Sequence, residues 1–172
     1  MHQGGRILLW ILAAALVAPA ARADISDVAV KAAFLPRFAR YVTWPPSART
    51  NGPMVICIIG DDPFGDLLRQ EAASQEVDGR PFVIRRLSST SGASDCAIAF
   101  VDGSRTGELL DGLGRQPILT VTDARSNPRR GIIHFAIVDG RVRFFIDNAQ
   151  AQARGLTISS RLLALAIGVN GK

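Results

Sequence analysis

The stretch Met54-Val55-Ile56-Cys57-Ile58-Ile59, followed by Gly60-Asp61-Asp62-Pro63-Phe64-Gly65, decides the fold class of this chain. Six consecutive apolar residues, most of them β-branched, are typical of a strand that is buried on both faces of a sheet. Asp62 and Pro63 then have the residue types of a helix N-cap and a first helical position, which predicts a helix through Ala73. A buried strand that leads directly into a helix indicates a β–α unit of a parallel sheet.

The rest of the chain continues this alternation. Apolar runs predict strands at residues 82–87, 96–101 and 118–122 and a short helix at 106–113. Asp139-Gly140 is a strong hairpin signal between two further predicted strands. We therefore expect an α/β fold with a mostly parallel sheet flanked by helices, a C-terminal antiparallel hairpin and a Rossmann-like three-layer arrangement. The remaining predicted elements are an amphipathic first helix at 24–41, hairpin strands at 132–138 and 141–146, and a last helix within 149–169.

The N-terminus has the three parts of an export signal. A basic start ends at Arg6, an apolar run of 14 residues follows at 7–20, and Ala21-Arg22-Ala23 supplies a small-x-small cleavage pattern. The run is shorter than the roughly 20 residues that span a bilayer, so an uncleaved anchor is the weaker interpretation. We predict a signal peptide at residues 1–23, cleavage after Ala23, and one exported domain at 24–172.

Composition excludes several classes of function. A chain of 172 residues with 48% hydrophobic and 20% charged residues is ordinary for a globular domain and excludes wholesale disorder. Two histidines, one of them within the predicted signal peptide, and two cysteines leave no zinc finger or multi-histidine site. We therefore expect no metal and no cofactor. The net charge of +5 does not argue for nucleic acid, because an exported protein does not meet the genome.

Candidate catalytic groups each lack a partner that their chemistry needs. The turn at Asp61-Asp62 lacks the glycines and lysine of a phosphate-binding loop, so structural capping is the favoured interpretation. A phosphoacceptor domain resembling response-regulator receivers would use Asp61, Asp62, Asp102 and Thr122, but the required lysine is missing. His134 lies in a predicted strand, and no nucleophile elbow exists. We expect no catalytic residues and no enzyme; a hydrolase remains an alternative only if Asp61 and Asp62 are catalytic.

Cys57 and Cys96 are the only cysteines. In an oxidising compartment such a pair suggests a disulfide, and the two predicted strands that carry them are often neighbours in sheets of this kind. Closing a loop of about 40 residues would stabilise the fold by on the order of 4 kcal/mol. Two buried free thiols are the alternative.

Arginines of the hairpin and the last helix are the remaining candidates. Arg141 and Arg143 share one face of their predicted strand, while Val142 and Phe144 point to the other. A solvated face is the ordinary interpretation for such strand arginines. Arg161 is predicted in a leucine-rich helix, where it would pair with a carboxylate or with backbone carbonyls if buried, or bind an anion.

Several blocks of the sequence together form a specific pattern. They are Val30-Lys31-Ala32-Ala33-Phe34-Leu35-Pro36-Arg37-Phe38 with Trp44-Pro45, residues 57–65, Asp95-Cys96, Arg141-Val142-Arg143-Phe144 and residues 155–163. In this order the blocks resemble the YfiR family of exported bacterial proteins. The resemblance implies a periplasmic regulatory protein that binds and represses an inner-membrane diguanylate cyclase of the YfiN type, and so modulates cyclic-di-GMP signalling and biofilm formation. It also implies a homodimer, and an outer-membrane lipoprotein, YfiB, that sequesters the repressor.

The resemblance assigns no contact residue securely. The cysteines at 57 and 96 match one family pair whose oxidation supports the repressive form, while a second family pair is absent. Candidates for partner or ligand binding are therefore Phe38, Tyr41, Trp44, Arg143 and Arg161, with core packing the favoured role of Phe38. The alternative function is a periplasmic small-molecule sensor whose pocket includes Arg161 and the region of Trp44.

Overall fold

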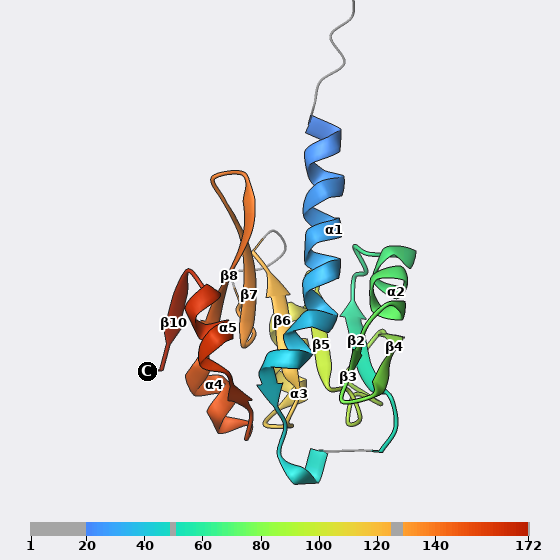
Figure 1. The fold of residues 1–172 in the computed structure, drawn as a ribbon, viewed down its shortest axis with the longest axis vertical. Coiled ribbons are helices and arrows are strands. Elements are labelled where there is room, and N and C mark those ends of the chain that lie inside the picture. The colour runs from blue at the N-terminus through green and yellow to red at the C-terminus, as the bar shows by residue number, and fades with distance from the viewer. Residues whose placement is uncertain (1–19, 49–50, 125–128, 172) are drawn as a thin grey trace, which may run out of the picture.

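A computed structural model of the chain describes residues 20–48, 51–124 and 129–171. These residues form an eight-stranded sheet with helices on both faces, which confirms the predicted α/β class and three-layer arrangement (Figure 1). Most of the predicted signal peptide lies outside the described residues. In chain order the elements are α1 (Ala20–Phe38), η1 (Ala39–Tyr41), β1 (Val42–Thr43), η2 (Pro46–Ala48), β2 (Met54–Gly60), α2 (Asp66–Ala73), β3 (Glu76–Val77), β4 (Arg80–Leu87), β5 (Ile98–Asp102), α3 (Thr106–Leu113), β6 (Leu119–Asp123), β7 (Ile133–Val138), β8 (Arg141–Asp147), α4 (Asn148–Ala153), β9 (Thr157–Ile158), α5 (Ser160–Leu165) and β10 (Gly168–Asn170).

The strand order of the sheet is β10-β8-β7-β6-β5-β2-β4-β3. The five central strands β7, β6, β5, β2 and β4 are all parallel, as the alternating pattern predicts. The predicted hairpin adds β8 antiparallel to β7. A separate two-stranded sheet pairs β1 with β9, with Val42 opposite Ile158. Within the described ranges no helix is both long and apolar enough to cross a membrane.

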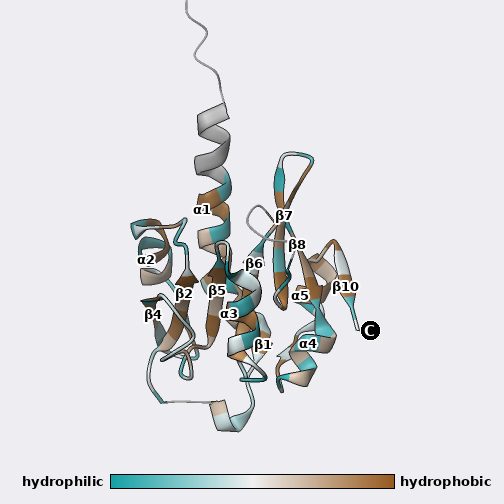
Figure 2. Cartoon of the chain, turned by 180° about the vertical axis from the view of Figure 1, so that it is seen from behind, coloured by the Kyte–Doolittle hydropathy of each residue, from teal (hydrophilic) through white to brown (hydrophobic). Residues whose placement is uncertain are grey.

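The central strands bury side chains on both faces of the sheet, and Figure 2 shows their hydrophobic colour. On β2, Ile56 and Ile58 enter a core shared with α1, α2, α4 and α5, while Cys57 and Ile59 enter a second core against α3. The six-residue apolar run is buried along its whole length because it separates these two cores.

Two turns need glycine or a tolerant residue. Gly60 ends β2 with a φ of +91°, and a Cβ there would clash with the backbone oxygen of Asp102 on the neighbouring strand. Asp139 and Gly140 have φ values of +49° and +69°, which are the two positive values of a type I′ hairpin turn. The hairpin signal in the sequence therefore has its expected geometry.

The ends of the chain differ from the prediction. Helix α1 begins at Ala20 rather than at residue 24, because alanine-rich residues favour continuation of the helix. Gly155 breaks the last helix near its start, as its residue type predicts: α4 ends before it, and Gly155 has a φ of +72°. The helix expected beyond Gly155, up to residue 169, is shorter than predicted, because α5 covers only Ser160–Leu165. The chain then pairs with β1, re-enters a short helix capped by the Ser159 hydroxyl, and closes with β10 beside β8. The backbone N–H and C=O groups of β9 and β10 are paired by β1 and β8, which lie far away in the sequence.

Candidate functional site

Four phenylalanines, two on α1 and two on the sheet, hold α1 against the sheet. The ring of Phe38 lies 5.8 Å from that of Phe135 and 5.4 Å from that of Phe144, and its side chain is 1% exposed. Phe34 stacks on Phe38 at 5.6 Å, one helical turn away. Phe38 therefore has the core-packing role. The prediction that it contacts a partner directly is wrong, because its side chain is buried beneath the surface.

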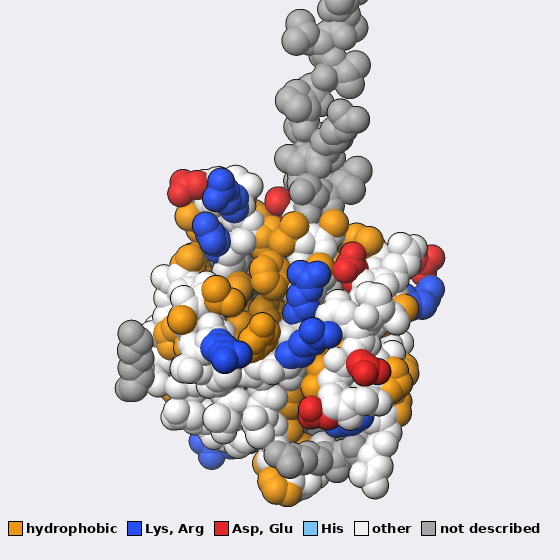
Figure 3. Space-filling view, viewed as in Figure 1, with side chains coloured by type: hydrophobic (Ala, Val, Ile, Leu, Met, Phe, Trp, Pro, Cys, Tyr) orange, Lys and Arg blue, Asp and Glu red, His pale blue; other side chains and the backbone are white. Residues whose placement is uncertain are grey.

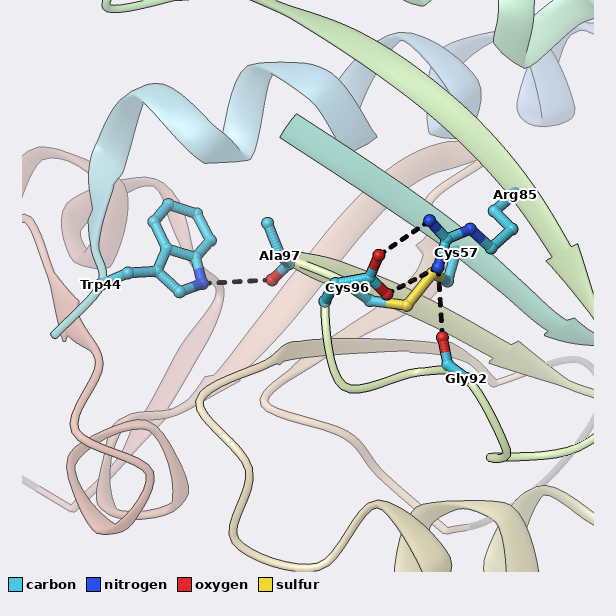
Figure 4. Close-up of a disulfide and its surroundings, with 7 residues drawn as sticks. Trp44, Cys57, Arg85, Gly92, Cys96 and Ala97 are labelled. Atoms are coloured by element: carbon cyan, nitrogen blue, oxygen red, sulfur yellow. Dashed lines mark hydrogen bonds and ion pairs between the residues drawn. A yellow bond between two sulfur atoms is a disulfide. The ribbon is translucent and has the colours of Figure 1, made fainter. Parts of the chain in front are cut away.

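Trp44 is also buried, with 9% of its surface exposed. Its indole Nε1 donates a hydrogen bond of 3.2 Å to the backbone oxygen of Ala97, which fixes the segment after η1 against the start of β5 (Figure 4). Burial of a tryptophan with its N–H satisfied is typical of a structural position. The Trp44 ring is thus held in the core and does not project from the surface to contact a partner.

A buried ion pair holds α1 at a second point. Lys31 Nζ lies 2.5 Å from Asp123 Oδ2 at the end of β6, with the two residues 2% and 7% exposed. The charges of such a pair depend on each other, because either one alone would be uncompensated inside the protein. Sequence reasoning missed this pair. The signal that pointed to it is a single lysine inside an otherwise apolar helical stripe.

The end of α1, the start of α5 and strand β8 lie side by side (Figure 1). The Ser159 amide donates a 2.8 Å hydrogen bond to the backbone oxygen of Tyr41, so Tyr41 and the helix that carries Arg161 are brought together. Phe34 of α1 contacts Phe144 of β8 with ring centroids 5.8 Å apart. The structure thus unites two of the predicted candidates, Tyr41 and Arg161, on one side of the molecule.

We call this region the arginine face. Half-buried apolar side chains from α1, η1, β8 and α5 pack on the core beneath it, and Figure 3 shows apolar and basic side chains gathered there together. Its apolar members are Phe34, Tyr41, Val142, Leu163 and Ala166; its basic members are the exposed residues Arg37, Arg40 and Arg161, together with the exposed hairpin residues Arg141 and Arg143 at its border.

The basic members of the arginine face differ from most other arginines of the protein. None of the five forms an ion pair or a side-chain hydrogen bond with a described residue. Five other described arginines have a carboxylate partner: Asp66, Asp95, Asp62, Glu108 and Asp111 pair with Arg69, Arg85, Arg86, Arg105 and Arg129.

The hairpin arginines border this face from its edge. Along β8 the exposed residues Arg141 and Arg143 alternate with the half-buried Val142 and the buried Phe144, as the strand period predicts. Val142 and Phe144 belong to the core under α1, so the two arginines leave the strand on its other side. They add positive charge beside the apolar members of the arginine face rather than between them.

The cysteine pair lies under the opposite face of the sheet. Cys57 on β2 and Cys96 form a disulfide in the core packed against α3, in agreement with the prediction from the cysteine count (Figure 4). Beside it Arg85 donates two hydrogen bonds of 2.6 and 2.8 Å to the Asp95 carboxylate and one of 3.2 Å to the Gly92 oxygen. The hydrogen bonds from Arg85 lower the pKa of Asp95. The loop before β5 is therefore held by a covalent bond and a bidentate ion pair.

The acidic turn has the structural role that the sequence favours. The Asp62 carboxylate accepts hydrogen bonds of 2.9 and 3.2 Å from the amides of Phe64 and Gly65, and it pairs with Arg86 Nε at 2.6 Å. It caps a turn rather than α2 itself, which begins four residues later at Asp66. These contacts engage the Asp62 carboxylate within the protein, in a structural role.

His134 is buried in the sheet, where its Nδ1 shares a 2.8 Å hydrogen bond with Thr122 Oγ1. Thr122 Oγ1 also accepts from the Gly131 amide at 2.9 Å, so the hydroxyl completes a local network. Burial lowers the pKa of His134, the positive charge of Arg130 lowers it further, and Asp123 opposes the shift. The imidazole is thus neutral and built into the strand pair β6–β7.

A cavity of about 730 Å³ opens at the other end of the sheet. Trp44 and Cys96 line it together with Arg40, Arg80 and Asp95. Arg161 does not line this cavity. The expectation that one sensor pocket contains both Arg161 and Trp44 is therefore wrong. The Trp44 indole is held in the core by its bond to the Ala97 oxygen, whereas the exposed Arg161 lies outside the cavity lining.

Comparison with family models adds an independent finding. Residues 28–167 match the model of a family described as YfiR/HmsC-like. No match to a curated protein is found. The matched range contains both cysteines and the whole arginine face. The chain therefore belongs to the YfiR/HmsC-like family, a family of regulatory proteins of the periplasm rather than of catalysts.

Proposed function

We propose that this protein is a periplasmic repressor that binds the periplasmic domain of an inner-membrane diguanylate cyclase of the YfiN type and holds the cyclase inactive. In this role it lowers cyclic-di-GMP and restrains biofilm formation. Family membership supports the regulatory role, and the export signal supports cleavage after Ala23 and release of residues 24–172 as one domain. The observation that carries the proposal is the arginine face, a surface that combines apolar side chains with unpaired charge.

Repression by binding requires a difference in affinity. The protein must bind the inactive conformation of the cyclase more tightly than the active one, and each 1.4 kcal/mol of difference shifts the equilibrium about tenfold. Tyr41, whose backbone oxygen accepts the bond from the Ser159 amide, and Arg161, two residues after Ser159, are the proposed contacts, with Arg143 at the edge of the arginine face. Phe38 and Trp44 keep α1 and η1 in place behind them.

Two further parts of the proposal concern assembly. We propose that the protein is a homodimer and that an outer-membrane lipoprotein of the YfiB type relieves repression by occupying the surface that the cyclase uses. Competition for one surface explains release without any chemical step, because binding of one partner lowers the free concentration available to the other. The catalytic candidates Asp62 and His134 serve structural contacts, which supports binding as the mode of action.

The direct test is co-purification of the processed chain with the periplasmic domain of a cognate cyclase, combined with a cyclic-di-GMP reporter in cells. The wild type is expected to bind and to lower the reporter signal. Tyr41→Ala combined with Arg161→Ala is expected to lose both effects, while Arg115→Ala, at an exposed site after α3, retains them. Absence of wild-type binding to cyclases encoded beside this protein would contradict the proposal.

A second candidate, a small-molecule sensor, is favoured by the cavity beside Trp44. Its lining carries cationic and anionic groups from Arg40, Arg80, Glu76 and Asp78, which suits a polar ligand with charge of its own. Thermal shift of the processed chain against amino acids and anionic metabolites tests it, since a bound ligand raises the melting temperature with saturation. A shift that Arg40→Ala abolishes would support this function, and no shift across both classes would exclude it.

A further inference from the structure

Resting on the proposed function, we infer that the arginine face binds a segment of the partner in which apolar side chains are flanked by aspartate and glutamate. This chemistry follows from three properties of the face: the sign of its unpaired charge, the depth of its apolar side chains and its inability to pair with a copy of itself.

The charge defines the flanks of the bound segment. Arg37 and Arg40 lie three residues apart near the end of α1, and Arg161 lies in the first turn of α5, next to the Ser159–Tyr41 hydrogen bond that joins the two elements. All three are exposed and form no ion pair with a described residue. A guanidinium presents paired N–H groups that match a carboxylate, and such pairs strengthen when a contact excludes water.

The depth of the apolar side chains defines what enters between the arginines. Phe34 and Tyr41 are half-buried and packed on the core, as are Leu163 and Ala166. Side chains that anchor a protein in a membrane project into the bilayer, whereas the apolar members of this face are half-buried; the exposed Leu165 and Ile167, at 62% and 43%, are not among them. The apolar members of the arginine face therefore accept side chains from a protein partner, as the apolar centre of an interface does. They do not insert into a bilayer themselves.

A second copy of the chain does not fit the same face. A two-fold interface sets each surface against itself, so the arginines of one copy would meet those of the other. Like charges placed opposite each other oppose association and direct the surface to a different partner. The occupant is therefore a heterologous, acidic and amphipathic segment, and homodimer contacts lie elsewhere on the protein.

The test is a binding titration of the processed chain with the cyclase periplasmic domain at low and high salt. The wild type is expected to bind more weakly as salt rises, because the contacts are ionic. The triple variant Arg37→Glu, Arg40→Glu, Arg161→Glu is expected to bind about a hundredfold more weakly, as three lost pairs predict. The matched control carries the same change at three exposed sites away from the face, Arg69→Glu, Arg105→Glu and Arg115→Glu, and is expected to bind as the wild type does.

The outcomes separate this inference from the proposed function. If the wild type does not bind the cyclase domain, the proposed function fails. If it binds but the triple variant binds equally well, the function stands and the acidic segment is wrong. Binding of the wild type, but not the triple variant, to vesicles of phosphatidylglycerol and phosphatidylethanolamine without binding to the cyclase domain would assign the face to a membrane. A change in the monomer–dimer equilibrium of the triple variant would assign it to a second copy.

Circular dichroism and melting temperature of both triple variants establish that any loss of binding is not a loss of folding. A second comparison, Tyr41→Ala with all arginines intact, is expected to weaken binding without changing its salt dependence. That separation distinguishes the apolar centre from the charged flanks. A salt dependence that disappears in the Tyr41 variant would contradict the division of roles.

Discussion

The pairing of arginine with carboxylates differs between two regions of the protein, on opposite sides of the sheet. On the side that carries α3 and the disulfide, Arg85 pairs with Asp95 and Arg129 pairs with Asp111, so these two charges are satisfied within the chain, whereas Arg115 after α3 has no carboxylate partner among the described residues. On the side that carries α1 and α5, Arg37 and Arg161 have no carboxylate partner among the described residues. A surface with satisfied charges is complete by itself, whereas one with like charges around an apolar strip is arranged for contact with another molecule. The comparison assigns stability to the first side and recognition to the second.

The largest effect is expected where α1 meets the sheet. Lys31→Met leaves Asp123 buried without its cation and is expected to destabilise the protein by about 3–5 kcal/mol. Urea unfolding measures the change. Lys31→Met combined with Asp123→Asn is expected to lose less than Lys31→Met alone, because no charge is then left buried. Equal losses in the two variants would show that packing rather than charge holds the helix.

Removal of the disulfide is the next largest change. Cys57→Ser with Cys96→Ser is expected to reduce the free energy of unfolding by about 2–4 kcal/mol, because the unfolded chain regains the freedom of the loop. Phe34, Val142 and Leu163 of the arginine face pack on the core across the sheet from this bond, and only Arg40 shares a cavity lining with Cys96, so partner affinity of the folded variant should match that of the wild type. A folded variant with weakened partner binding would connect the two sides and contradict their separation.

A smaller effect is expected from the pH dependence of His134. Burial lowers its pKa in the folded protein below the ordinary value of about 6.5, so the unfolded chain binds the proton more readily. The stability that the neutral imidazole provides is complete above about pH 6.5 and is lost as the pH falls through the folded-state pKa. His134→Gln is expected to flatten the loss of melting temperature between pH 7.5 and pH 5. An unchanged slope would assign the acid sensitivity to other groups.

The smallest effect is expected from the Arg85–Asp95 pair. Its side chains are 38% and 48% exposed, so solvent screens the attraction, and Arg85→Ala is expected to cost less than about 1 kcal/mol. Because the hydrogen bonds from Arg85 lower the pKa of Asp95, the contribution of that carboxylate is lost as the pH falls below about 3.8. Urea titrations at pH 7 and pH 3 measure both. A loss above 2 kcal/mol would mean that the loop depends on the pair more than on the disulfide.

The elements that sequence reasoning predicted are those with a local cause. The apolar run of β2 and the Asp139-Gly140 turn carry their own signals, and both lie where expected. The break at Gly155 carries such a signal too, but β9 and β10 were not predictable in this way, because they exist only through pairing with β1 and β8.

The same distinction applies to the candidate site. Phe38 and Tyr41 lie in one apolar stripe, and only the positions of Phe135 and Ser159 decide that the first is buried and the second reaches the surface. The lysine within an apolar helix is a local signal of a buried cation, but its partner Asp123 lies 92 positions away, so no local pattern identifies the pair. Arg161 was a candidate on the sequence alone, but its proximity to Tyr41 follows from the β1–β9 pairing.

Hydrogen exchange of the processed chain, alone and with the cyclase periplasmic domain, tests the division between the two sides most directly. Complex formation is expected to slow amide exchange at residues 34–41 and 160–166, while residues 85–97 around the disulfide exchange as in the free protein. Protection confined to residues 85–97, with residues 34–41 unchanged, would contradict the assignment of recognition to the side of α1 and α5.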